Sequence, residues 1–402
     1  MVKSNINEFF EDYIKKDSLF KDKKFLQSSY TPENIPHRDN EIKEIAGMLA
    51  PALKNEKPSN LFVYGKTGTG KTISVLHVID KLNKISKDKN IGLKIFYLNC
   101  KLKKVADTEY RLIATLAREF GKNVPVTGLP TDEIYRIFIE SIDSKHQNII
   151  LVLDEIDQLI KKAGDEILYN LTRLNSELSN TQITFIGISN DLRFANDIDP
   201  RVKSSLTEED INFPSYNALQ LQDILNERSI KAFKNGVLEE GSIEKCAALA
   251  AREHGDARRA LDLLRVAGEL AERKGSDKLL IKHIDDAEEK IERDLVSEVV
   301  STLPKQSQLA LLAVFDLYGK NNSKIYTGDV YNLYKSLSSD IGLKPLTQRR
   351  MSDLIGELDM LGVINAKVIS KGRYGRTRAI GMTIPDSEIP NLKEGLKRWL
   401  NL

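Results

Sequence analysis

The sequence predicts an α/β domain built on a parallel sheet, then an all-helical domain, then a C-terminal domain that contains a β-hairpin. Up to about residue 213, strand-like apolar runs alternate with helical stretches, a pattern typical of buried parallel strands covered by helices on both faces. From residue 214 to about 295, alanine, leucine and charged residues recur at helical spacing, without a strand signal. Further on, short helical segments precede an alternating stretch at 365–384, which predicts the hairpin.

Five runs in the first part predict a five-stranded parallel sheet. Most of them are apolar on both faces and are bounded by turn or charged residues, as expected for strands buried between two layers of helices. A helical pattern follows the first run directly. The runs cover residues 61–65, 93–100, 149–155, 183–189 and 208–213.

Length and composition limit the possible classes of protein. A chain of 402 residues is long for a single domain, and 41% hydrophobic with 29% charged residues is a globular composition. No apolar run approaches the roughly 18 residues of a membrane span, and the N-terminus lacks the core of a signal peptide. Cys100 and Cys246 are too few for a disulfide framework or a zinc cluster. We therefore expect a cytoplasmic protein without a membrane partner.

The most specific motif follows the first predicted strand. Residues 65–72, GKTGTGKT, fit the pattern G-x-x-x-x-G-K-[ST] at every position, between a strand and a helix. Its glycines let backbone N–H groups face phosphate oxygens, its lysine reaches the β and γ phosphates, and its threonine can bind Mg²⁺. The flanking strand and helix disfavour a chance match. We expect ATP or ADP with Mg²⁺ on Gly65, Lys66, Thr67, Gly68, Thr69, Gly70, Lys71 and Thr72.

Polar residues at the ends of two later strands fit the same chemistry. Asp154 ends an apolar run and is placed to hold Mg²⁺, and Glu155 beside it can polarise the attacking water as a general base. Asn190 ends the next run, and its amide can hold the water or the γ-phosphate. Each has an ordinary alternative, since an acidic pair often simply ends a strand and asparagine commonly starts a turn.

The order of these motifs, followed by DPRVKSSL at 199–206 and HGDARRALDLL at 254–264, resembles that of AAA+ ATPases. The resemblance implies that Arg201 is an arginine finger, acting on nucleotide held by a neighbouring subunit. It also implies that Arg258, rather than Arg259, is a second sensor that reaches from a helical lid to the γ-phosphate. A guanidinium in either place can stabilise charge on the transferred phosphoryl group. Arg201 could instead cap a surface loop.

A narrower resemblance covers nearly the whole chain, from about residue 25 to 385. SSYTPENIPHRDNEIKEI at 28–45 and FPSYNALQLQDILNER at 213–228 look like segments of the archaeal replication initiators, relatives of the eukaryotic origin-recognition complex and its loading partner. The resemblance implies double-stranded origin DNA, paralogous initiator subunits and the replicative helicase as partners.

In that family, nucleotide contacts also come from these two segments. The resemblance implies that His37 and Arg38, after Pro36, lie near the adenine, and that Tyr216 and Arg228 bind nucleotide. The flat ring of Tyr216 suits a base. Arg228 could equally be a solvated lid arginine.

The C-terminal part is typical of a winged helix. Thr347 is a good N-cap for a helix that Gly362 ends, and the apolar face of this helix predicts packing through its middle. Its first turn, Gln348–Arg349–Arg350, is polar and free. A helix–turn–helix unit contacts bases with the first turn of its second helix, so these residues are the candidate base readers.

The hairpin that follows would be the wing. Residues 344–378 hold eight basic and three acidic residues, a net of +5, although the whole chain carries only +2. Candidate contacts to phosphates or the minor groove lie in KGRYGRTR at 371–378. They are Lys371, Arg373, Tyr374 and Arg376. A winged helix that binds protein, with a solvated basic turn, is the alternative.

We expect an N-terminal extension at 1–27, an AAA+ core at 28–213, a lid at 214–295 and a winged-helix domain at 296–402. A helical insertion at 107–131 would mark an initiator and can touch DNA, as the family resemblance implies. The resulting hypothesis is a nucleoid-associated, ATP-regulated initiator with slow hydrolysis. Its rivals are a remodelling or clamp-loader-like ATPase with a protein-binding winged helix, and a nucleotide-sensing transcription regulator.

Overall fold

The structure is a computed structural model that describes residues 17–101, 108–125, 128–194, 198–206, 209–320, 325–370 and 376–402. Contacts divide the chain into two compact units, Met1–Ile284 and Asp285–Leu402. Among these described residues, every helix is too short or too polar to cross a membrane.

The first unit contains the predicted five-stranded sheet. Its strands lie in the order β2-β3-β4-β1-β5, and all neighbouring pairs are parallel. Each predicted run lies within two residues of an observed strand. The strands are β1 (Leu61–Gly65), β2 (Leu93–Asn99), β3 (Gln147–Asp154), β4 (Thr181–Ser189) and β5 (Glu209–Phe213). Because they are parallel, their carboxyl ends meet at one edge, where Asn99 is in register with Asp154.

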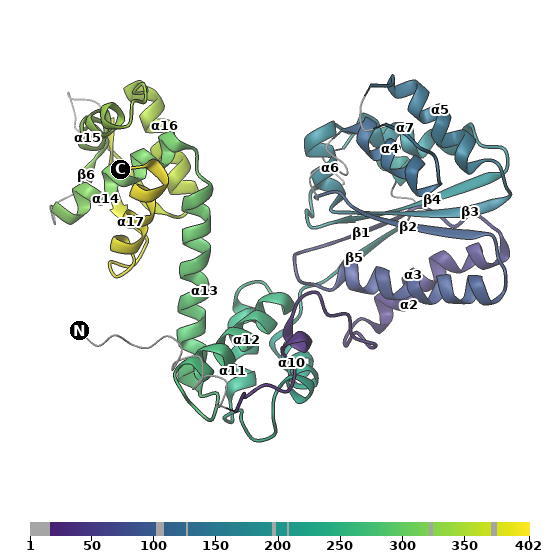
Figure 1. Cartoon of the computed structure of the whole chain (residues 1–402), viewed down its shortest axis with the longest axis horizontal. Helices are drawn as coiled ribbons and strands as arrows, with labels where there is room; N and C mark the ends of the chain where they lie inside the picture. The colour runs from purple at the N-terminus through teal and green to yellow at the C-terminus, as the bar shows by residue number, and fades with distance from the viewer. Residues whose placement is uncertain are drawn as a thin grey trace. The chain divides into compact units, whose positions relative to one another are not determined.

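Helices cover both faces of this sheet (Figure 1). On one face lie α2 (Asp39–Leu49) and α3 (Lys71–Asp88), joined by η2 (Ala50–Lys54). On the other face lie α4 (Glu109–Glu119), α5 (Thr131–Ile142), α6 (Ile156–Ala163), α7 (Glu166–Arg173) and η3 (Leu174–Ser176). Consecutive residues of β3 alternate between the two cores, which explains its unbroken apolar run.

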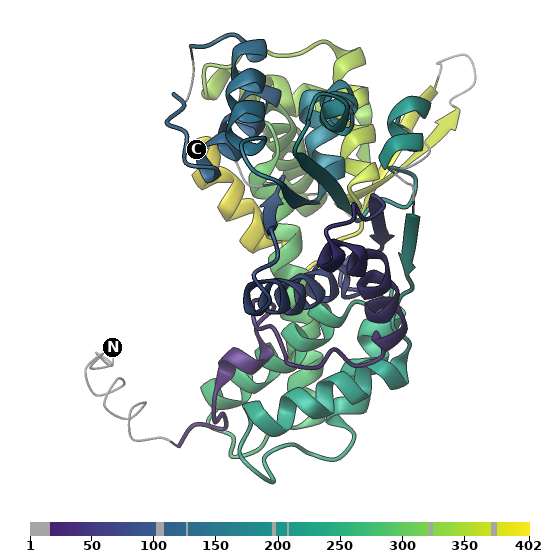
Figure 2. The same cartoon turned by 90° about the vertical axis from the view of Figure 1, so that its right-hand side faces the viewer.

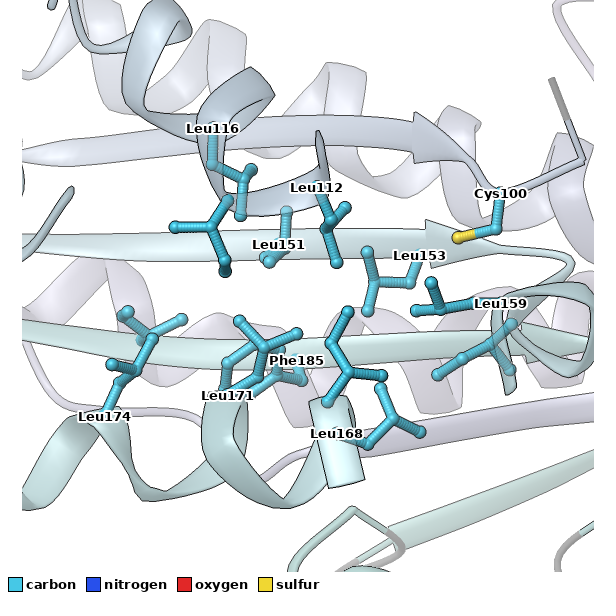
Figure 3. Close-up of a cluster of buried hydrophobic side chains, with 14 of the residues drawn as sticks. Cys100, Leu112, Leu116, Leu151, Leu153, Leu159, Leu168, Leu171, Leu174 and Phe185 are labelled. Atoms are coloured by element: carbon cyan, nitrogen blue, oxygen red, sulfur yellow. The ribbon is translucent and has the colours of Figure 1, made fainter. Parts of the chain in front are cut away.

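The core on the second face is built from leucines and aromatic rings. Figure 3 shows Leu151 and Leu153 of β3 pointing toward Leu112 and Leu116 of α4, with Leu168 and Leu171 of α7 closing the cluster. This packed layer fixes the carboxyl end of β3. The helix α9 (Pro200–Leu206) follows β4 and leads to β5.

An all-helical lid completes the first unit. It consists of α10 (Ala218–Ala232), α11 (Ser242–Arg252) and α12 (Ala257–Arg273). Asn217 and Gln220 form a capping box at the start of α10, and Asp256 caps α12 by accepting from the backbone N–H groups of Arg258 and Arg259. The short helix η1 (Lys23–Leu26) packs against α10 and α12.

The second unit begins within α13 (Ile281–Thr302). The expected short helical segments are α14 (Lys305–Lys320), α15 (Thr327–Asp340) and α16 (Gln348–Met360), and the expected hairpin consists of β7 (Ile364–Ser370) and β8 (Arg376–Met382). Two elements were not predicted: β6 (Ile325–Tyr326), which pairs with β8, and the closing helix α17 (Ile389–Leu400).

The ends of α16 follow the sequence prediction. The Thr347 hydroxyl accepts from the Arg350 N–H, and Gly362 adopts a left-handed φ of 71° just beyond the helix. Met351, Leu354, Ile355 and Leu358 are buried in the core of this unit. The first turn of α16 is therefore left facing outward.

Candidate functional site

A cavity of about 300 Å³ lies at the carboxyl edge of the five-stranded sheet, between the core and the lid of the first unit. This is the edge where ligands bind in open α/β sheets. Its lining comes from the 65–72 loop, the ends of β2 and β3, the lid helices α10 and α12, and a segment before α2. The predicted site residues among it are Gly68, Gly70, Lys71, Thr72, Asp154, Glu155, Asn190, Tyr216, Arg228 and Arg258.

The loop has the geometry of a phosphate cradle. Gly68 and Gly70 have φ of 70° and 91°, and α3 begins at Lys71, directly after Gly70. The Lys71 ammonium donates to the carbonyls of Gly65, at 2.7 Å, and Lys66, at 2.6 Å. Thr69 is buried and donates to the same Lys66 carbonyl, so it holds the loop rather than lining the cavity.

Lys71 is only 4% exposed. Burial and then the nearby positive charge of Arg258 lower the pKa of its ammonium to about 8, against the pull of Asp154 and Asp256. A cationic pair facing one cavity favours an anionic ligand.

Asp154 gathers polar contacts at the end of β3. Its Oδ2 accepts from the Thr72 hydroxyl at 3.0 Å and from the Tyr97 hydroxyl at 2.7 Å. Its Oδ1 accepts from the backbone N–H of Glu155. Thr72 and Asp154 place hard oxygen ligands together beside the phosphate loop, which fits Mg²⁺. Tyr97 was missed in the sequence, although it lies near the end of the strand that neighbours β3.

Glu155 has a left-handed backbone, with φ of 53°, at the start of α6. Such a conformation is strained in a residue other than glycine, and strain of this kind is concentrated at functional sites. Lys101 lies 3.8 Å from its carboxylate. The side chain lines the cavity, as a residue that polarises water must.

The lid contacts the phosphate loop through the first turn of α12. The Ala257 N–H donates to the Gly68 carbonyl at 3.2 Å, and a Cβ on Gly68 would lie 1.7 Å from Asp256 Oδ1. Arg258 lines the cavity, whereas Arg259 forms an ion pair with Glu253 at 3.0 Å.

Aromatic and cationic groups form the opposite wall. Tyr216 is 4% exposed, and its hydroxyl packs against Gly70. Arg228 is 7% exposed and lies 4.5 Å from the ring centre of Tyr30, and its Nη1 has no hydrogen-bond partner among the described residues. A buried, unpartnered guanidinium nitrogen at a cavity indicates an anionic or polar ligand. Tyr30 was also missed, because only the fold brings it to Arg228.

Arg38 lies behind the cavity rather than in its wall. It is 2% exposed and donates to the carbonyls of Thr69, at 2.9 Å, and Pro214, at 2.5 Å, while its guanidinium stacks on Tyr216 at 4.0 Å. Its place is between the phosphate loop, the sheet and the lid. His37 forms a 3.0 Å contact with Asp223. Pro36, just before these two, does line the cavity.

Asn190 and Arg201 differ in their position. Asn190 is exposed at the end of β4 and lines the cavity. Arg201 is exposed on α9, is held by Asp199 at 2.9 Å, and lies outside the cavity lining. The Arg201 guanidinium also lies 5.1 Å from the Tyr169 ring.

In the second unit, Gln348, Arg349 and Arg350 are exposed in the first turn of α16. Arg350 lies 3.7 Å from Asp353 and 3.5 Å from Glu357. Among the other predicted contacts, Lys371, Arg373 and Tyr374 lie outside the described residues, and Arg376 is described only in its backbone. In the predicted insertion of the first unit, Thr108 caps α4, and Arg118 donates to the Val124 carbonyl at 3.0 Å.

Comparison with protein families finds three matches along the chain. An AAA domain matches residues 54–194, a Cdc6 AAA+ ATPase-type lid domain matches 222–289, and the CDC6 C-terminal winged helix domain matches 298–391. The fold, the phosphate loop and these matches define a P-loop ATPase of the AAA+ class with a C-terminal winged helix.

Relatives that match nearly the whole chain identify the family within this class. The chain is 52% identical over 392 residues to an ORC1-type DNA replication protein of Pyrococcus abyssi, covering 96% of this chain and 93% of that one. It is 50% identical over 388 residues to ORC1-type DNA replication protein 1 of Methanosarcina mazei, again covering 96% and 93%. The chain belongs to the family of ORC1-type DNA replication proteins.

Solved structures agree with this assignment. The Aeropyrum pernix ORC1 protein, solved in complex with DNA, has a TM-score of 0.81 at 42% identity, covering 94% of this chain and 98% of that one. The Aeropyrum pernix ORC2 protein, solved as ADPNP-ADP complexes, has a TM-score of 0.60 at 21% identity, covering 96% and 100%, and shares the fold.

Proposed function

We propose that this protein binds origin duplex DNA through its winged helix and insertion, and that slow ATP hydrolysis in the AAA+ core switches its state. The observation that carries this proposal is the exposed first turn of α16, with Arg349 and Arg350, on a chain 42% identical to a protein solved with DNA. An exposed polar turn on a helix that is otherwise packed is the geometry with which helix–turn–helix proteins read bases.

The nucleotide site supplies the switch. Lys71 and the loop amides would bind the β and γ phosphates, Thr72 and Asp154 would hold Mg²⁺, and Glu155 would polarise the attacking water. Bound Mg²⁺ would neutralise charge on the phosphate oxygens. Asn190 would hold the water or the γ-phosphate, and Arg258 would reach the same group from the lid.

The position of Arg201 supports the proposal of slow hydrolysis. The Arg201 guanidinium is exposed on α9 and lies outside the cavity of its own chain. The arginine finger for the nucleotide in this cavity would therefore have to come from the Arg201 of a neighbouring subunit. A lone chain would then keep its nucleotide, with ADP as the retained product. Paralogous initiator subunits are the proposed neighbours, and loading of the replicative helicase is the proposed downstream step.

Equilibrium binding to a labelled origin duplex and a random duplex of equal length, at several salt concentrations, tests the DNA part. Arg349→Ala with Arg350→Ala should cost about 1–3 kcal/mol per lost base contact, on the origin duplex only. Arg373→Ala with Arg376→Ala should flatten the log–log salt slope by roughly 2. Arg398→Ala, which removes an exposed arginine of α17, is the control and should change neither quantity.

Equal, weak binding of both duplexes, unaffected by these substitutions, would overturn the proposal. The winged helix would then face a protein, and a remodelling ATPase would be the better description.

A further inference from the structure

An N-terminal strap, residues 17–30, is docked on the lid and runs into the wall of the nucleotide cavity. Leu19, Phe20 and Leu26 in it are buried, at 4%, 5% and 0% exposure. Figure 2 shows this purple segment beside the teal lid helices. Neither the phosphate-loop chemistry nor the winged helix accounts for such an anchored segment ahead of the core.

Phe20 is the hydrophobic anchor of the strap. Its ring stacks on Phe233, at the end of α10, with ring centres 4.5 Å apart. A Cβ on Gly268, inside α12, would lie 2.5 Å from the Phe20 ring and 3.0 Å from the Phe233 ring. Glycine weakens a helix interior relative to alanine. Its presence at position 268 is explained by the room that Phe20 needs.

Hydrogen bonds hold the backbone of the strap on both sides of Phe20. The N–H groups of Lys21 and Asp22 donate to the Ala232 carbonyl at 2.8 and 3.2 Å, and the Lys234 N–H donates to the Leu19 carbonyl at 2.9 Å. Glu272 of α12 accepts from the Leu19 N–H at 3.0 Å and pairs with Lys23 at 2.9 Å. The dock is thus built from both α10 and α12.

The other end of the strap forms part of the cavity wall. Gln27, Ser28 and Tyr30 line the cavity. Tyr30 lies against Arg228, and Phe25 packs edge-on against Tyr30 at 4.9 Å. Arg228 lies in α10, the helix that ends in the Phe20 dock. Movement of Phe20 out of its dock would therefore move this wall of the cavity.

We propose that Phe20 is a positioning residue for bound nucleotide: its docking between Phe233 and Gly268 holds the strap as a closed wall and slows nucleotide release. The coupling is reciprocal, because a nucleotide that contacts Tyr30 and Arg228 stabilises the docked strap by the same free energy. This inference rests on the nucleotide site of the proposed function and adds to it the element that controls the residence time of ADP.

Release of methylanthraniloyl-ADP from the full-length chain, chased with excess ADP, tests the inference. Phe20→Ala should release the probe at least about tenfold faster. Loss of a buried phenylalanine ring shifts the equilibrium between docked and undocked strap toward the undocked form by more than that factor. Gly268→Ala should do the same by expelling the ring. Gly47→Ala is the matched control, because Gly47 also lies inside a helix of the first unit and a Cβ there would have no atom within 4 Å. This variant should leave the release rate unchanged.

Gly268→Ala separates positioning from folding. It should strengthen α12 while releasing nucleotide faster, and in a Phe20→Ala background it should have no further effect on release. In the wild type, ADP should slow hydrogen exchange of the Lys21, Asp22 and Lys234 amides. Phe20→Leu, which refills part of the dock, should recover part of the slow release.

Two results would overturn the inference. In the first, the wild type binds the probe, and both Phe20→Ala and Gly268→Ala release it within about twofold of the wild-type rate. This result would refute the role of the strap and leave the nucleotide site intact. Failure of the wild type to bind the probe at equilibrium would refute the nucleotide site, and the strap with it.

Discussion

The Tyr97 hydroxyl lies 2.7 Å from Asp154 Oδ2, the same carboxylate oxygen that accepts the Thr72 hydroxyl. Burial and then this hydrogen bond raise the pKa of Tyr97, so the phenol stays protonated and donates. The end of β2 thus orients the acidic side chain at the end of β3.

Tyr97→Phe removes this orienting bond without changing the ring. Groups that orient metal ligands typically contribute about 10–100-fold in metal affinity. We expect Mg²⁺-dependent retention of ADP to require about tenfold more Mg²⁺, measured by titrating Mg²⁺ during probe release. Tyr110→Phe is the control, since the Tyr110 hydroxyl donates to the Pro125 carbonyl away from the cavity. An unchanged Mg²⁺ requirement in Tyr97→Phe would contradict the orienting role.

Lys71 makes ADP binding depend on pH. Its pKa of about 8 in the free protein means that the ammonium loses its charge above pH 8, whereas bound phosphate favours the charged form and raises this pKa. Binding at pH 9 should therefore take up close to one proton, and affinity should fall as pH rises above about 8. Calorimetry in buffers of different ionisation enthalpy measures this uptake. The same uptake in Lys71→Met would show that another group is responsible.

Gly68→Ala should damage the contact between the phosphate loop and the lid. The residue has a left-handed φ of 70°, and the added Cβ would collide with Asp256. We expect ADP affinity to fall at least about tenfold, since strain and collision both distort the loop that would bind the phosphates. Gly121→Ala shares the left-handed φ but has nothing within 4 Å, so it should lower only the melting temperature. Equal ADP affinities in the two variants would count against the contact.

Glu155→Gln should separate binding from hydrolysis. The amide keeps the shape of the side chain but cannot accept the proton of the attacking water, and general bases contribute typically 10²–10⁴-fold. Single-turnover hydrolysis of ATP should slow by at least about 100-fold, with ADP affinity within about threefold of wild type. Hydrolysis at the wild-type rate would exclude Glu155 as the base.

Local signals predicted most of the fold. The runs that became β1, β3 and β4 are buried on both faces, so their unbroken apolar character was readable without tertiary information. The capping of α16 by Thr347 was equally local. β6 has only two residues and forms because β8 lies beside it, so its sequence carries no strand signal of its own. α17 was not predicted, although Ile389, Leu392, Leu396 and Leu400 follow a helical spacing.

The site was predictable where a motif carries its own chemistry. Gly68 to Thr72 and Asp154 met in the structure because parallel strands end at one edge. Tyr30, Tyr97 and Phe20 could not be predicted, since their roles depend on partners that are distant in the chain. Tyr97 meets Asp154, 57 residues further on, and Phe20 meets Phe233, 213 residues further on. Arg38 belongs to a segment that resembles the family, but in the fold its guanidinium donates to the backbone carbonyls of Thr69 and Pro214.

The genome-wide footprint of the full-length chain in its own cells tests the central claim most directly. The account predicts one or a few strong binding sites, each coinciding with a position where nascent DNA synthesis starts, and loss of those sites in the Arg349→Ala, Arg350→Ala variant. Binding spread over many promoters, away from the start sites of synthesis, would contradict it and would make the chain a nucleotide-sensing transcription regulator.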